Sequence, residues 1–507
     1  EGEITLDERE SHHAANVLRV HEGERVAVLN GAGTEFMCAV AAVDKKAVRL
    51  KVQQQNNIAP LPYQITLLQA MTKGKSMDFI IRAFDADGGY ADLNVSCSIS
   101  DNFSTGNSNQ FSSLSASIDL GPKVILSDVA DCGSGKYLVC GKFADTLAVG
   151  TYKAVSTSGY DGFALRMNAR GQAEGLLHLA SNGEVITVAS TKDKDGTIHI
   201  TGYFSGKLSV GYLDIESSGQ NDVFLASWSQ KGDLLNLQSF GGAGDEKSTS
   251  VESIDGALVL SGFFSDSFQY GRISQKSSGG TDGFVLSVDA FDFQQINWFL
   301  PLVGSSDNRA NVMKVSSDGT LFVGGSFGSS AKMGGLELVS KGLSDAFVGK
   351  LTSNGKLEFL RSGGGVGKDG IDFFGLGRNG SLLVGGTFSE QFQWDSHKLI
   401  SKGARDVFLG SLSVSGNCLS LVGLGGSGTE EIRGLVVSYD TILVLGSFNG
   451  GMDLGSEKLY LARGGMDSFA AFYDHDLKSL GSGMRFGASG DRSEERRVGK
   501  ECRSRWS

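Results

Sequence analysis

The chain has 507 residues, of which 72 are glycine and only four are proline, and hydrophobic residues make up 40 % of it. This composition excludes a disordered Pro/Gly-rich chain and allows two or more domains with a sizeable core. The sequence contains no apolar run of about 18 residues and no basic and apolar leader at its start. Neither a membrane-spanning helix nor a signal peptide is therefore predicted.

The formal net charge of −11 is unevenly distributed along the chain. Residues 1–83 carry ten basic and ten acidic side chains, whereas residues 84–491 carry 30 basic and 44 acidic ones. Residues 492–507 are basic, so three compositions meet near positions 84 and 492. The acidic middle disfavours nucleic acid as its ligand, because binding to phosphates needs Lys and Arg.

The six cysteines include no CxxC pair, which disfavours a zinc ribbon or a dithiol redox site. Cys132 and Cys140 flank a Gly-Ser-Gly turn. They either form a disulfide across a hairpin or remain unpaired thiols. His12 and His13 are adjacent, so their side chains point apart and do not make a metal pair.

Residues 1–61 are expected to form a small β-barrel with one short helix. Asp7 and Glu10 have the spacing of a capping box, which predicts a helix start. The predicted strands are Val26–Leu29, Phe36–Val43 and Val48–Val52, joined by tight turns. Pro60 and Pro62 mark a linker. Residues 65–71 then read as a buried strand that leads to a helix start at residues 77–81.

Four ordered motifs of the first 82 residues resemble those of the bacterial 16S rRNA uracil-N3 methyltransferase family (the RsmE type). They are His12-His13-Ala14-Ala15-Asn16-Val17-Leu18-Arg19, Asn30-Gly31-Ala32-Gly33, Lys45-Lys46-Ala47-Val48 and the stretch from Leu68 to Arg82. The resemblance implies a PUA-like RNA-binding barrel, followed by a knotted domain that binds S-adenosylmethionine. It stops at Arg82, so residues 62–83 hold only the start of the cofactor domain. Methyl transfer by this chain, and a cofactor within it, are not expected.

The resemblance and their positive charge together select five side chains for contacts with ribosomal RNA. These are Arg19, Lys45, Lys46, Lys73 and Lys75. The alternative is that they are ordinary surface charges, because a domain without net charge attracts RNA only weakly.

A tandem array follows. The motif Asp-x-Phe recurs with aspartates at 161, 222, 282, 345, 406 and 467, and Gly-x-Phe recurs with phenylalanines at 143, 204, 264, 327, 388 and 448. Both ladders share a period of about 61 residues with the same longer third step, which defines six modules. Each module is read as four short strands with Asn-Gly or Asp-Gly turns, plus an outer hairpin such as Phe392–Trp394 with Lys398–Ile400.

Four strands per repeat predict the blades of a β-propeller, and the pattern around Asp345 resembles the SBBP-type propeller repeats of bacterial secreted proteins. The predicted fold class is therefore all-β, with the PUA-like barrel followed by a six-module propeller or an incomplete seven-bladed one. The array is assigned to residues 122–491, and residues 84–121 to a junction or partial blade.

Several local motifs in the array suggest chemistry. Gly363–Lys368 is similar to a phosphate loop but fails the Walker pattern, so it is read as a blade-to-blade turn. Asp193–Gly196 is similar to a calcium loop but lacks the later Glu, so it is read as a hairpin turn. One acidic residue per module, at Asp245, Asp307, Asp369 and Glu430, predicts an acidic ring that would hold a cation or a basic peptide. The alternative is a solvated rim. The spacing of the histidines within the array predicts no catalytic cluster.

Residues 492–507 resemble a translated sequencing adapter, which raises the possibility that the junction near residue 83 joins unrelated fragments. Two functional hypotheses follow. In the first, the chain is related to an rRNA methyltransferase through its RNA-binding domain, which implies the cytoplasm. In the second, it is a non-enzymatic propeller from an exported or surface protein.

Overall fold

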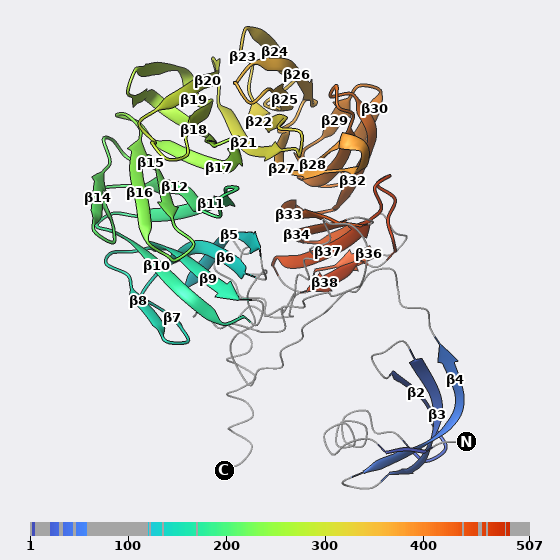
Figure 1. The fold of residues 1–507 in the computed structure, drawn as a ribbon. Helices are drawn as coiled ribbons and strands as arrows, with labels where there is room; N and C mark the ends of the chain where they lie inside the picture. Colours follow the sequence, from blue (N-terminus) through green and yellow to red (C-terminus); the bar gives the residue numbers. More distant parts are fainter. Residues whose placement is uncertain are drawn as a thin grey trace, which may run out of the picture. The chain divides into compact units, whose positions relative to one another are not determined.

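The computed structural model describes residues 3–5, 21–29, 34–43, 47–57, 120, 123–133, 136–168, 171–438, 441–454, 459–462, 465–481 and 483–486. The chain divides into two compact units, Glu1–Thr66 and Leu67–Ser507. The described residues are almost entirely β-strand (Figure 1), which confirms the predicted all-β class. Within those ranges no helix is long and apolar enough to span a bilayer.

The first unit contains a four-stranded antiparallel sheet with the order β1-β4-β3-β2. Its strands are β1 (Glu3–Thr5), β2 (Arg25–Leu29), β3 (Thr34–Val43) and β4 (Val48–Asn57). The last three coincide with predicted strands, whereas the predicted helices and residues 58–83 lie outside the described residues. Cys38, Val40, Val48 and Leu50 form the buried face, because alternate residues of a strand point to the same side.

Six four-stranded antiparallel blades make up the described part of the second unit. The first blade has β5 (Val124–Gly133), β6 (Lys136–Phe143), β9 (Asp161–Asn168) and β10 (Ala173–Ser181). The second has β11 (Val185–Lys192), β12 (Ile198–Phe204), β15 (Asp222–Trp228) and β16 (Leu234–Phe240). The third has β17 (Glu246–Ile254), β18 (Ala257–Tyr270), β19 (Ile273–Asp289) and β20 (Ile296–Gly304).

The other three blades repeat this order. The fourth has β21 (Asn308–Val315), β22 (Leu321–Phe327), β25 (Asp345–Leu351) and β26 (Leu357–Gly363). The fifth has β27 (Gly370–Leu376), β28 (Leu382–Phe388), β31 (Asp406–Leu412) and β32 (Cys418–Gly426), with the 3-10 turn η3 (Arg378–Gly380). The sixth has β33 (Glu430–Val437), β34 (Ile442–Phe448), β37 (Asp467–Tyr473) and β38 (Met484–Phe486). Figure 1 shows the six blades following one another around a common centre, which confirms the six-module propeller.

An outer hairpin separates the second and third strands of each blade. The hairpins are β7 (Thr146–Val149) with β8 (Tyr152–Val155), β13 (Lys207–Val210) with β14 (Leu213–Glu216), β23 (Ser330–Met333) with β24 (Leu336–Val339), β29 (Gln391–Trp394) with β30 (His397–Ile400), and β35 (Gly451–Asp453) with β36 (Leu459–Leu461). In the third blade the hairpin is the continuation of β18 and β19.

These hairpins tie neighbouring blades together. β13 pairs with β10 of the preceding blade, and β23 and β35 pair in the same way with β20 and β32. A single bridge between Gly364 and Gln393 makes the corresponding contact for β29. The hairpins of the second, fourth, fifth and sixth blades therefore contact the sheet of the blade before them.

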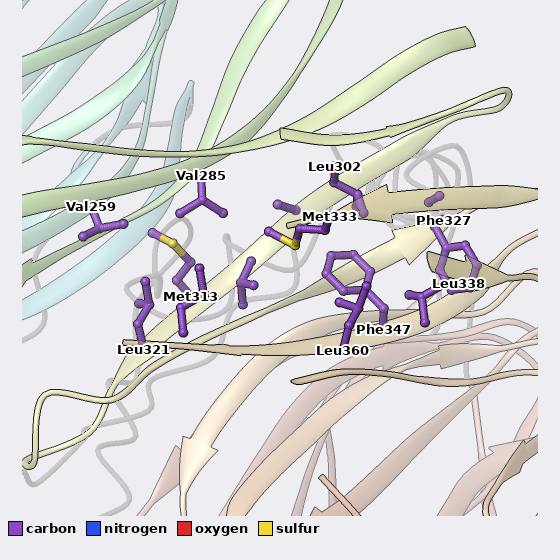
Figure 2. Packing of buried hydrophobic residues seen from close by; sticks show 14 of the residues in the cluster. Val259, Val285, Leu302, Met313, Leu321, Phe327, Met333, Leu338, Phe347 and Leu360 are labelled. Atoms are coloured by element: carbon purple, nitrogen blue, oxygen red, sulfur yellow. The ribbon is translucent and has the colours of Figure 1, made fainter. Parts of the chain in front are cut away.

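The hydrophobic core lies between facing blades. Figure 2 shows one such layer, in which Val259, Val285 and Leu302 of the third blade lie across from Met313, Phe347 and Phe327 of the fourth. The repeated phenylalanines of both ladders are fully buried, because each fills the space between two sheets. The four cysteines among the described residues, Cys38, Cys132, Cys140 and Cys418, form no disulfide. Cys140 is paired across the strands with Asp128 rather than Cys132, which explains why the two thiols are not joined.

Candidate functional sites

One exposed basic pair lies on the sheet of the first unit. Arg49 and Lys51 are exposed on β4, and they alternate with the buried Val48 and Leu50. Arg49 lies opposite Thr5 of β1, and Lys51 lies opposite Glu3. Both side chains therefore project from the face of the sheet opposite its core, where a phosphate backbone could reach them.

The five residues predicted to contact RNA, Arg19, Lys45, Lys46, Lys73 and Lys75, lie outside the described residues. Arg49 and Lys51 were not among the predicted contacts, although the alternation of Val48–Val52 carried the signal. The two basic residues there occupy the polar positions of a half-buried strand.

The aspartate of each Asp-x-Phe motif is buried between blades. Asp222, Asp345 and Asp406 are at most 2 % exposed, and each accepts a hydrogen bond from the backbone N–H four residues before it. The glycine-rich turns are shaped by these carboxyls. A Cβ at Gly241, Gly364 or Gly425 would overlap the carboxyl carbon of Asp222, Asp345 or Asp406, respectively. This confirms that the turn at 363–368 joins β26 to β27.

A second carboxyl lies beside each of these aspartates. Glu246 accepts a hydrogen bond from the backbone N–H of Gly242 at 2.7 Å. Asp369 and Glu430 accept the equivalent bonds from Gly365 at 2.8 Å and from Gly426 at 3.2 Å. Adjacent glycines thus bring together the pairs Asp222–Glu246, Asp345–Asp369 and Asp406–Glu430. Burial, together with the neighbouring aspartates, raises the pKa of Glu246 to about 8, of Asp369 to about 7 and of Glu430 to about 8.

At the boundary between the third and fourth blades, an amide side chain takes the place of the second carboxyl. Asn308 is equivalent to Glu246, because both lie opposite the ladder phenylalanine of their own blade. Its Nδ2 donates to Asp282 Oδ1 at 2.9 Å. The position therefore needs a hydrogen-bond donor toward the aspartate, which a carboxyl supplies only when it is protonated.

The four acidic residues that were predicted to form a ring do not occupy equivalent positions. Asp245 and Asp307 lie one residue before the position that Asp369 and Glu430 take in their blades. Asp245 is equivalent to Lys368 and Thr429, since all three bridge to the residue that precedes an Asp-x-Phe aspartate. Asp307 is exposed, whereas Asp369 and Glu430 are buried. The four acidic residues thus form two sets on different faces. Within the described ranges, no three His, Cys, Asp or Glu side chains come together as a metal site.

Two histidines have structural partners that spacing did not predict. His178 Nε2 lies 2.6 Å from Asp161 Oδ2, and the buried His199 lies 3.1 Å from Asp193 Oδ2. Burial lowers the pKa of His199, although Asp193 opposes this effect. Asp193–Gly196 is a hairpin turn, as predicted, with a backbone bond from Gly196 to Asp193.

Comparison with known proteins shows similarities of the N-terminal region. Residues 6–53 match the family model described as RNA methyltransferase PUA domain. The chain is similar to ribosomal RNA small subunit methyltransferase E of Bacillus subtilis, with 29 % identity over 89 residues that cover 17 % of this chain and 35 % of that protein. The chain thus spans about a third of the length of this curated relative.

A crystal structure of puromycin hydrolase is similar over 72 % of this chain and 54 % of its own, with 13 % identity and a TM-score of 0.29. The resemblance of the N-terminal region to RNA methyltransferases, predicted from its motifs, is confirmed through the PUA domain at residues 6–53.

Proposed function

We propose that the first unit binds ribosomal RNA and that this chain does not itself transfer a methyl group. The match of residues 6–53 to a PUA domain of RNA methyltransferases carries the proposal. The exposed Arg49 and Lys51 on β4 support it, because they offer two positive charges on one face of the sheet. Such binding would take place in the cytoplasm.

The folds that the described residues build support the proposal that this chain does not transfer a methyl group. These residues form the sheet β1–β4 and the six blades, and none of them builds the α/β layer that would hold S-adenosylmethionine. Residues 62–83, where the S-adenosylmethionine domain would begin, lie outside the described ranges.

Replacing Arg49 and Lys51 together by Ala should weaken RNA binding about equally for different sequences. Loss of two phosphate contacts should reduce the slope of log K against log salt by about 1.4 for a single strand. Fluorescence anisotropy of a labelled 16S rRNA fragment at several KCl concentrations measures both quantities. The matched control is K153A/K398A, which removes two exposed lysines from the blades. An equal loss in the control would contradict a role of the first unit.

The purified chain should add no methyl group to undermethylated 30S subunits supplied with radiolabelled S-adenosylmethionine. The physical reason is positioning, because methyl transfer requires the cofactor to be held beside the uracil. The control is the Bacillus subtilis relative under the same conditions. Incorporation by this chain above a sample without protein would overturn this half of the proposal.

For the blades we propose a binding role without chemistry. Their buried carboxyl groups accept hydrogen bonds from backbone N–H groups between blades. His178 and His199 lie against buried aspartates. What the blades present to a partner is their loops, which differ from one blade boundary to the next.

A further inference from the structure

A group of exposed aliphatic and basic side chains lies at the boundary between the fourth and fifth blades. The aliphatic members Val339, Leu343, Val366 and Ile400 are 69, 66, 57 and 71 % exposed. The basic members, all exposed, are Lys341, Lys368, Lys402 and Arg405. These eight residues are called the basic aliphatic patch.

The patch is continuous across three loops. Leu343 donates its backbone N–H to Gly367 at 3.1 Å, and Ser344 forms a bridge with Lys368. The loop at Gly365 lies against Gln391 of β29, and Gln391 is paired with Ile400 of β30. The side chains from 339–344, 365–368 and 400–405 therefore share one end of the blades.

Equivalent positions at the other boundaries show that the fold does not require Leu343, Val366 or Lys368. Leu343 corresponds to Gly159, Gln220, Gly280, Ala404 and Gly465, counted from the Asp-x-Phe aspartate. Val366 corresponds to Ala243, Ser305 and Ser427, and Lys368 to Asp245, Asp307 and Thr429. At these three positions, small, polar or acidic residues of the compared boundaries are thus replaced by Leu, Val and Lys.

The charge of the patch opposes that of the whole chain. Four basic residues gather there, although the net charge of the chain is −11. Two of them are partly neutralised, Lys402 by Asp453 at 3.0 Å and Arg405 by Glu431 at 3.4 Å, and Glu390 is exposed nearby. Lys341 and Lys368 remain as exposed charges beside Leu343 and Val366.

We propose that the basic aliphatic patch docks onto an anionic lipid surface. Leu343 and Val366 lie on loops, and Val339 and Ile400 are the last residues of β24 and β30, so these exposed side chains can enter the boundary between headgroups and acyl chains. Lysines at the same level would meet anionic headgroups, each contributing to attraction within about a Debye length. A contiguous exposed apolar group of this kind marks an interaction surface.

The test is co-sedimentation of the full chain with vesicles. Vesicles of phosphatidylcholine with phosphatidylserine should retain the protein, vesicles of phosphatidylcholine alone should retain much less, and added salt should weaken the binding. The double variant L343G/V366S, which takes residues from other boundaries, should bind at least tenfold more weakly. K368D should also weaken binding, by about fivefold for each unit of charge changed.

Two controls separate the patch from other surfaces. Val155→Ser removes an exposed aliphatic residue of the first blade that has Thr157 rather than a lysine beside it, and should leave binding unchanged. R49A/K51A should also leave it unchanged, which distinguishes this surface from the RNA-binding unit. Equal binding to neutral vesicles, full binding by L343G/V366S with an unchanged melting temperature, or capture of an acidic apolar peptide without vesicle binding would overturn the proposal.

Discussion

The triple variant E246Q/D369N/E430Q should lose most of the dependence of propeller stability on pH between about 5 and 8. In the unaltered chain, burial raises the pKa of these carboxyls to about 8, 7 and 8, respectively. The ordinary values are 4.5 for Glu and 3.8 for Asp. Urea unfolding at a series of pH values measures the change.

The sign follows from proton linkage. Between the ordinary and the raised pKa, the folded chain holds a proton at each pair that the unfolded chain has released. The free energy of unfolding therefore falls as the pH rises, by up to about 1.4 kcal/mol per pH unit for each pair. The contribution is fully present below about pH 4, falls progressively as the pH rises, and is lost once the pH has passed 7 to 8.

The charged groups around the pairs agree with this direction. Asp222, Asp245 and Asp266 all raise the pKa of Glu246, whereas Lys341 and Lys402 only partly oppose the effect at Asp369 and Glu430. Asp222 Oδ1 and Glu246 Oε1 are buried without a hydrogen-bond partner, as are Asp406 Oδ1 and Glu430 Oε1. A proton shared within each pair would satisfy these oxygens.

The repeat supplies matched controls. Asn308→Asp should create a fourth pair with Asp282 and steepen the pH dependence, since it replaces an amide donor by a carboxyl. Asp233→Asn should change little, because Asp233 is exposed and is not among the charges that act on the three pairs. An unchanged slope in the triple variant would show that the pairs do not carry the shared protons.

The strands could be predicted because every module repeats the same signals. The Asp-x-Phe motif at Asp345 begins β25, and the predicted hairpin at residues 392–400 coincides with β29 and β30. Strand pairing between modules could not be predicted from these signals. That the hairpin of one blade pairs with the outer strand of the blade before it depends on tertiary register rather than local pattern.

The buried carboxyl pairs were missed for a related reason. Acidic residues at 245, 307, 369 and 430 have nearly equal spacing, but adjacent residues of a strand point to opposite faces. Counting 24 residues from the Asp-x-Phe aspartates instead aligns Glu246, Asp369 and Glu430. Asn308 takes the same place only through its strand pairing with Phe327. The candidate RNA contacts Arg49 and Lys51, unlike the buried carboxyl pairs, could have been predicted from the alternation of polar and apolar residues in their strand.

Trp394→Ala should destabilise the propeller by about 3–5 kcal/mol, the range for removing a large aromatic side chain from a core. Trp394 is 1 % exposed, and a Cβ at Gly363 of the preceding blade would overlap its ring. The neighbouring Phe392 is stacked on Phe408 with ring centroids 4.3 Å apart. The tryptophan thus fills the space that Gly363 leaves open and holds the hairpin β29–β30 onto the fourth blade.

Backbone bonds make this hairpin a defined contact between blades. Gly364 donates its N–H to Gln393 at 3.0 Å, and Gln393 donates to Gly364 at 3.2 Å. Without the indole, these two bonds should open more often, so their amide protons should exchange faster than those of β28. Ile400→Ala in the same hairpin is the control, because Ile400 is 71 % exposed and its loss should change stability by about 0.5 kcal/mol or less. Equal destabilisation by the two variants would mean that the tryptophan does not anchor the hairpin.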